Sequence, residues 1–229
     1  MAEQTHEQAS AQAIARSGAA IVLSKIFWVP IPEEMIGAWR VDKTFAYLQE
    51  YFDVIGCDDG GAIATLVEDL CAGTQAATER RLNVESTYLF RIGDDEVPAS
   101  PYGSVWLEPE RLLMGSTTQA VAVFYREHGA RVADEAGDFI PDHISRELEF
   151  LAFMWRKEVE ARGAGDLEAA SRHKEAGQEF FLTHCAGWWP LFAQAVTAHA
   201  ETTFFKSAGA LLSCYTDALS VRCNAAHTA

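Results

Sequence analysis

The clearest pattern in this chain is a run of apolar residues at helical spacing that begins just after Pro141. Steps of four, three, four and four residues separate the members of one stripe, which are Ile144, Leu148, Leu151, Trp155 and Val159. A second apolar face carries Phe150, Phe153 and Met154. A helix that is apolar on two faces is expected to be covered on two sides, so this pattern predicts a long buried helix over about 142–162.

The rest of the chain also has helical character, interrupted by proline, glycine and acidic segments. Pro30 and Pro32 end the first expected helix, and Asp166 is placed to cap the helix after the long one. We expect the other helices at about 7–28, 33–55, 62–72, 75–91, 109–114, 117–128, 166–185, from 188 onward and 203–219. Residues 105–107 and 121–125 have strand-like composition, but neither segment alternates or has a hairpin partner. The pattern predicts an all-α fold.

The segment 129–141 is rich in glycine and acidic residues and separates two helical halves. We therefore expect an N-terminal helical part over 1–128, a linker or hinge over 129–141 and a C-terminal helical part over 142–221. The tail 222–229 lacks an apolar face and is expected to fray. A linker of this kind would permit a monomer or a domain-exchanged dimer.

The charge of the chain restricts its partners. There are 33 acidic and 18 basic residues among 229, which gives a formal net charge of −15. Nucleic acid is disfavoured because its phosphates would be repelled, and no segregated basic patch is evident. Partners that carry positive charge are favoured.

The N-terminus and the cysteines indicate the compartment. Met1-Ala2-Glu3-Gln4 has no basic region of the kind that opens a secretory signal, and the apolar run at 19–23 is too short to span a bilayer. The five cysteines are odd in number, widely spaced and without a Cys-x-x-Cys pair. We expect reduced thiols, no structural metal and a cytoplasmic protein.

Asp142 and His143 open the long helix and are the first candidates for a functional site. They could simply cap the helix, because short polar side chains commonly satisfy free backbone groups there. Glu147 lies one turn beyond His143, so an alternative is a helical metal-dependent hydrolase that uses Asp142, His143 and Glu147. No third ligand stands at the usual spacing, and nucleotide-binding and hydrolase motifs are absent.

A second candidate is the aromatic pair Tyr102 and Trp106, which stands among small residues after a polar, proline-containing segment. Such a pair is often part of a core. Amphipathic aromatic residues beside a loop also suit a groove that receives an apolar peptide.

A set of motifs in a fixed order resembles the TorD/DmsD family, the NarJ-related maturation chaperones of molybdoenzymes. The motifs are Glu85-x-x-x-Leu89-Phe90, Pro101-Tyr102-Gly103-Ser104-Val105-Trp106-Leu107, Gly115-x-x-Thr118, Tyr125-x-x-x-Gly129, Pro141-Asp142-His143-Ile144 with Glu147-Leu148 and Phe150-Leu151, Phe181-Leu182-x-His184, and Trp189-Pro190-x-Phe192. The resemblance spans roughly residues 85–212, while the N-terminal third matches only in helical character.

The resemblance implies a two-part helical fold and a role that is not enzymatic. Members bind the twin-arginine signal peptide of a molybdopterin oxidoreductase precursor, keep the apo-enzyme ready for its cofactor and delay its export. The implied peptide-binding residues are Leu89, Phe90, Tyr102, Trp106, Gly115, Asp142 and His143. No cofactor of its own is implied for the chaperone. Guanine-nucleotide binding has been proposed within the family, but no phosphate-binding loop stands out in this chain.

Overall fold

The computed structural model describes residues 2–91, 97–130 and 140–227, and its secondary structure is helical throughout. Within these residues there is no β-strand, so the predicted all-α fold is confirmed. The elements are α1 (Ala2–Ile26), α2 (Glu33–Val41), α3 (Thr44–Ile55), α4 (Ala62–Cys71), α5 (Gln75–Phe90), α6 (Gly103–Leu107), α7 (Ser116–Glu127), α8 (Ile144–Gly163), α9 (Leu167–Phe180), a π-helical turn (Phe181–Cys185), α10 (Trp189–His199) and α11 (Thr203–His227).

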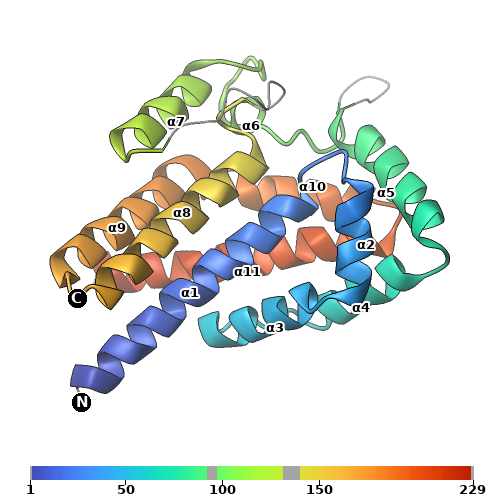
Figure 1. Ribbon diagram of the computed structural model, residues 1–229. Coiled ribbons are helices and arrows are strands. Elements are labelled where there is room, and N and C mark those ends of the chain that lie inside the picture. Colours follow the sequence, from blue (N-terminus) through green and yellow to red (C-terminus); the bar gives the residue numbers. More distant parts are fainter. Residues whose placement is uncertain (1, 92–96, 131–139, 228–229) are drawn as a thin grey trace.

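Helix α8 lies near the centre of the molecule, between α1 and α9, as Figure 1 shows. Helix α11 packs against α10 and α4, and α1 also packs against α3. Both predicted faces of α8 contribute to the core, with Leu148, Leu151 and Trp155 buried on one face and Phe150 and Met154 on the other. The core therefore closes on two sides of α8, as its sequence predicts.

A buried ion pair joins the N-terminal and C-terminal parts of the chain. Arg16 on α1 donates from Nη2 to Glu158 Oε2 on α8 at 2.9 Å, and its guanidinium lies 4.3 Å from the ring of Trp155. Arg162 holds the other oxygen of Glu158 at 2.9 Å. The two parts thus share one core across α1 and α8. Residues 131–139 of the expected linker lie outside the described residues, and the domain boundaries stay a prediction.

The helix expected over 33–55 is wrong as a single element, because it is divided into α2 and α3. Asp42 Oδ1 accepts the backbone N–H of Thr44 at 2.8 Å, and Asp42 itself is extended. A short acidic side chain that accepts a backbone N–H two residues further along competes with the helix, which explains the break.

The helix expected over 109–114 is also wrong. The short helix α6 comes earlier, at Gly103–Leu107, over residues whose composition resembles a strand. In the segment that follows, Arg111 and Met114 have φ angles of 52° and 64°, which are incompatible with a right-handed helix.

Helix α11 continues to His227, into the segment 222–229 that is expected to fray from its sequence. Leu219 and Cys223 are both buried and lie four residues apart, so they extend the apolar face of the helix by one turn.

Asp166 is confirmed as a cap, since its Oδ1 accepts the backbone N–H of Ala169 at 2.9 Å.

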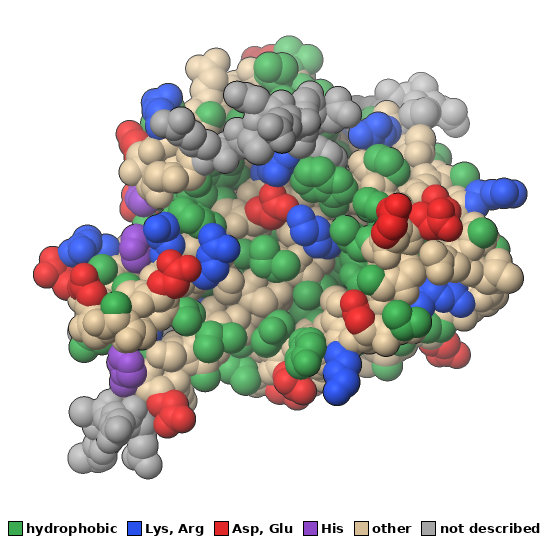
Figure 2. Space-filling view, in the orientation of Figure 1, with side chains coloured by type: hydrophobic (Ala, Val, Ile, Leu, Met, Phe, Trp, Pro, Cys, Tyr) green, Lys and Arg blue, Asp and Glu red, His purple; other side chains and the backbone are tan. Residues whose placement is uncertain are grey.

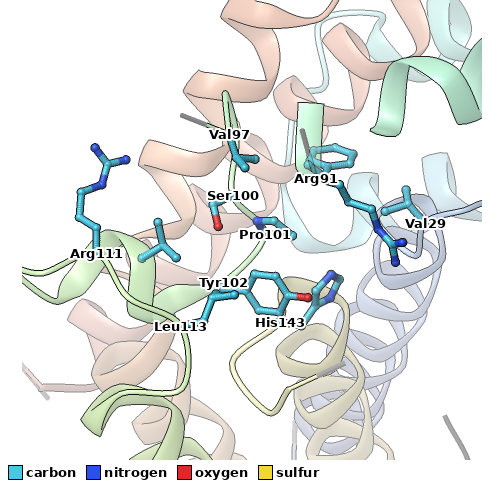
Figure 3. A pocket seen from close by; sticks show the side chains of 11 residues that line it. Val29, Arg91, Val97, Ser100, Pro101, Tyr102, Arg111, Leu113 and His143 are labelled. Atoms are coloured by element: carbon cyan, nitrogen blue, oxygen red, sulfur yellow. The ribbon is translucent and has the colours of Figure 1, made fainter. Parts of the chain in front are cut away.

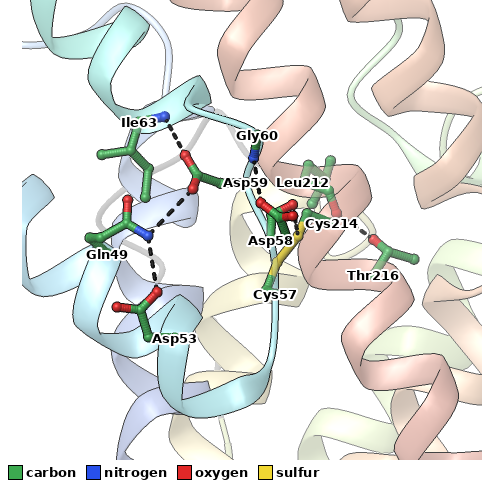
Figure 4. Close-up of a disulfide and its surroundings, with 10 residues drawn as sticks. All are labelled: Gln49, Asp53, Cys57, Asp58, Asp59, Gly60, Ile63, Leu212, Cys214 and Thr216. Carbon is green, nitrogen blue, oxygen red and sulfur yellow. Dashed lines mark hydrogen bonds between the residues drawn. A yellow bond between two sulfur atoms is a disulfide. The ribbon is translucent and has the colours of Figure 1, made fainter.

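The expectation that every cysteine is a reduced thiol is wrong for one pair. A disulfide joins Cys57, in the loop after α3, to Cys214 on α11, with the Cα atoms 5.8 Å apart (Figure 4). The two cysteines are 157 residues apart in sequence, so no local spacing reveals the pair. Cys71, Cys185 and Cys223 are free thiols.

Acidic and basic side chains are interspersed over the face in Figure 2, with apolar side chains exposed between them. Among the described helices, none combines the length and the apolar character that crossing a membrane requires.

Candidate functional site

The start of α8 is joined to the segment before α6 by a short antiparallel pairing. Gly103 N donates to Asp142 O at 2.9 Å, and Ile144 N donates to Pro101 O at 2.8 Å. Tyr102 and His143 face each other within this bridge, with ring centroids 5.0 Å apart in an edge-to-face arrangement. Two motifs that are about forty residues apart in sequence are therefore in direct contact.

Asp142 is fully buried and connects three elements. Its Oδ2 accepts the backbone N–H of Ser104 in α6 at 2.7 Å, and its Oδ1 accepts the hydroxyl of Thr118 in α7 at 2.9 Å. The carboxylate thus binds α6 and α7 to the start of α8. It does not cap α8, because that position belongs to His143.

His143 is buried and caps α8 through its side chain. Its Nδ1 accepts the backbone N–H of Ser145 at 3.1 Å, so the neutral ring carries its proton on Nε2. Burial lowers the pKa of His143 well below its usual range, and the nearby charges of Arg146 and Arg91 lower it further. The ring is therefore neutral at pH 7.

Beside this junction lies a pocket of about 430 Å³ with mainly apolar walls (Figure 3). It is lined by Val29, Phe90, Arg91, Val97, Ser100, Pro101, Tyr102, Val105, Arg111, Leu113 and His143. The side chains come from the segment after α1, the end of α5, the segment around α6 and the residue that caps α8. An apolar concave surface with a few polar groups at its edges suits an apolar segment of a ligand.

Three of the seven residues expected to bind a peptide line this pocket, namely Phe90, Tyr102 and His143. Leu89 is fully buried in the core. Trp106 is half-buried and its Nε1 donates to Ser100 O at 2.7 Å, which fixes the segment that carries Tyr102. Asp142 lies behind the wall. The structure brings the motifs together, but several of these residues hold the pocket wall in place and do not line the pocket.

Gly115 is explained by packing at the start of α7. A Cβ atom at this position would overlap the carboxylate of Glu108. That carboxylate accepts the backbone N–H of Thr117 at 2.6 Å and the hydroxyl of Ser116 at 3.2 Å. These hydrogen bonds lower the pKa of Glu108. A larger residue at position 115 would push the Glu108 carboxylate away and disturb its hydrogen bonds to the first turn of α7.

The sequence did not reveal Arg111 and Leu113 as pocket residues. The consecutive apolar residues 112–114 are the available signal, but they fall within the helix expected over 109–114. Nothing in the local sequence marks Arg91, Val29 or Val97 as pocket residues.

Glu147 lies apart from this pocket. Its Oε2 accepts Trp189 Nε1 at 2.8 Å, and burial raises its pKa well above the usual range. Burial, together with Glu147, also raises the pKa of the neighbouring thiol of Cys185. Asp142, His143 and Glu147 therefore share no hydrogen-bond partner in these contacts, which does not favour the hydrolase alternative. Among the described residues no group of three His, Cys, Asp or Glu side chains could hold a metal ion.

Comparison with known proteins places these features in a family. The sequence model of the nitrate reductase delta subunit family matches residues 58–194. The chain is 28% identical over 120 residues to the Tat proofreading chaperone DmsD of Salmonella typhi, covering 52% of each chain. It is 30% identical over 115 residues to the chaperone protein TorD of Vibrio vulnificus, covering 50% of this chain and 51% of the relative.

Two further relatives extend the comparison. The chlorate reductase assembly chaperone protein of Ideonella dechloratans is 32% identical over 123 residues, covering 54% of this chain and 61% of the relative. The crystal structure of a proposed redox enzyme maturation protein from Archaeoglobus fulgidus has the same fold, with a TM-score of 0.52, 24% identity and coverage of 86% and 90%. The chain spans about half the length of the DmsD and TorD relatives it matches.

Proposed function

The chain belongs to the nitrate reductase delta subunit family, which includes the TorD and DmsD chaperones, and from this premise we propose that it is a chaperone for the maturation of a molybdopterin oxidoreductase. In this proposal it binds the twin-arginine signal peptide of the precursor and keeps the apo-enzyme ready for cofactor insertion. It acts in the cytoplasm, before export, and catalyses no reaction itself.

The observation that carries this proposal is the pocket beside the start of α8. Its walls combine three of the residues that the family resemblance implies for peptide binding, Phe90, Tyr102 and His143, with further apolar side chains. A signal peptide has a basic front followed by an apolar stretch. We infer that the apolar stretch occupies the pocket, because burial of apolar surface contributes about 25 cal/mol per Å².

The neutral state of His143 supports the same assignment. A charged imidazolium in this wall would be unfavourable, because the ring is buried and the charge would have no hydration. The low pKa that burial imposes on His143 avoids this cost at pH 7. The ring can then form part of an apolar wall without carrying a charge.

The proposal can be tested by calorimetric titration with twin-arginine signal peptides from the molybdoenzymes of the host. One control peptide keeps the arginines and has serine and glycine in place of the apolar stretch. A second control peptide has lysine in place of both arginines. We expect micromolar or tighter binding of the intact peptide and a large loss for the first control peptide.

A variant pair locates the binding. Val105→Asp places a charge in the pocket wall and should weaken binding at least tenfold, while Val41→Asp on exposed α2 should not. If no host signal peptide binds the intact protein, the proposed function is wrong. If peptides bind and Val105→Asp has no effect on their affinity, the peptide occupies another surface.

A further inference from the structure

We propose that residues 108–115 form the client-selecting rim of the pocket, and that Leu112, Leu113 and Met114 contact the apolar stretch of the signal peptide. The inference rests on the proposed function, because it names the residues that distinguish between peptides bound at the same site. The occupant is an apolar segment of a precursor, with its arginine pair outside the pocket.

The first reason is the exposure of three consecutive large apolar side chains. Leu112, Leu113 and Met114 are 63%, 52% and 67% exposed. Elsewhere in the described residues, the exposed large apolar side chains are not adjacent in sequence. Single exposed apolar residues are ordinary, whereas a contiguous group marks a contact surface.

The second reason is that the backbone holds this group outward. Arg111 and Met114 have φ angles of 52° and 64°, which residues with a Cβ atom seldom adopt. Such conformations persist where the surrounding structure fixes them, and they are found preferentially at binding sites. Here the segment is fixed at both ends, because Arg111 N donates to Glu108 O at 3.1 Å and the Glu108 carboxylate binds Thr117 N. The side chains are thus displayed before a ligand arrives.

The third reason is continuity with the pocket. Leu113 and Arg111 line the pocket itself, and Leu112 and Met114 stand next to Leu113 in sequence. A peptide that fills the pocket and leaves it over this wall would cover the exposed group. The rim and the pocket together therefore offer a longer apolar track than the pocket alone.

Charge determines which part of the peptide uses this track. Among the described residues that line the pocket, the charged ones are Arg91 and Arg111, which Figure 3 shows on opposite sides. None of the described lining residues is acidic, so none of them could pair with the arginines of a signal peptide, whereas an apolar stretch needs no such partner. The apolar stretch therefore lies in the pocket and across the rim, while the arginine pair lies outside.

The test compares Leu112→Ser and Met114→Ser with Val41→Ser, a control that is 85% exposed and does not line the pocket. Each is titrated with a signal peptide whose apolar stretch is rich in leucine and with a matched peptide in which those leucines are alanines. Each rim variant should bind the leucine peptide roughly five- to tenfold more weakly and the alanine peptide about twofold more weakly or less. Val41→Ser should bind both peptides as the unaltered protein does.

The outcomes separate this inference from the proposed function. Equal affinity of the rim variants and the unaltered protein for both peptides would overturn the inference and leave the proposed function standing. A loss of affinity of the same size for both peptides would also overturn it, since the rim would then not distinguish one apolar stretch from another. If the unaltered protein binds neither peptide, the proposed function fails and this inference fails with it.

Discussion

Asp142 acts through the segments it holds, because its carboxylate is buried and already accepts hydrogen bonds from Ser104 and Thr118. We expect Asp142→Asn to cost about 1 kcal/mol, because an amide can bond to both partners but loses the strength that a charge gives to each bond. Asp142→Ala should cost roughly 2–5 kcal/mol, since the buried amide of Ser104 is left without a partner. Urea unfolding measures both values.

Peptide affinity should fall together with stability in the Asp142 variants, because both depend on the positions of α6 and α7. Thr118→Val is the matched control, since it removes one of the two hydrogen bonds and leaves the carboxylate in place. If Asp142→Asn loses affinity while its free energy of unfolding is unchanged, the carboxylate contacts the peptide directly.

Glu147 makes stability depend on pH. Burial raises its folded-state pKa well above the ordinary value of 4.5, so the folded protein holds a proton that the unfolded chain releases. The stabilisation that this bound proton gives the folded state is fully present below pH 4.5. As the pH rises from there towards the folded-state pKa, the free energy of unfolding falls by about 1.4 kcal/mol per pH unit. Glu147→Gln does not titrate, so its stability relative to the unaltered protein should increase with pH.

Unfolding of both proteins at pH 5, 6.5 and 8 tests this expectation. Glu160→Gln, on the exposed side of the same helix, is the control and should show no such trend. A stability difference for Glu147→Gln that is constant across these pH values would mean that Glu147 is ionised in the folded protein.

At the scale of elements, the connection from α6 to α7 forms one wall of the pocket, and its geometry depends on Gly115. Gly115→Ala should displace the Glu108 carboxylate and lower both the melting temperature and the peptide affinity. Glu108→Ala should have the same effects, because it removes the same hydrogen bonds to the start of α7. The double variant should be no worse than either single variant. Additive losses would show that the two residues act independently.

The same connection marks the limit of prediction from sequence. Helix α8 was predictable because Leu148, Leu151 and Trp155 repeat at helical spacing. The sequence predicts a helix over 109–114, because nothing in these side chains indicates the left-handed backbone at Arg111 and Met114. That conformation comes from tertiary contacts, so the rim of the pocket was visible only in the structure.

At the scale of the whole molecule, the family motifs predict where the site lies. Which motif residues line the pocket and which support it is evident only from the fold. Phe90, Tyr102 and His143 line the pocket, whereas Leu89, Trp106 and Asp142 support it from behind. The disulfide between Cys57 and Cys214 was hidden for a similar reason, since only tertiary structure brings residues 157 positions apart together.

The net charge of −15 should act mainly on the rate of association. Raising the ionic strength from about 0.01 M to about 0.15 M shortens the screening length from about 30 Å to about 8 Å. Association with a basic signal peptide should slow by about tenfold, while dissociation changes little. Stopped-flow fluorescence at both salt concentrations measures the two rates. If the association rate does not change with salt, the acidic surface does not speed the encounter with the peptide.

The most direct test is to map where the peptide lies. A twin-arginine signal peptide with a photoreactive leucine analogue in its apolar stretch is bound to the protein, irradiated, and the cross-links are located by mass spectrometry. We predict cross-links at the pocket and its rim, within residues 97–115 and at Phe90, Arg91 and His143, and their loss when an excess of unlabelled peptide competes. Cross-links confined to other surfaces, such as the exposed face of α5 around Val84 and Tyr88, or no specific cross-link at all, would contradict the proposed binding site.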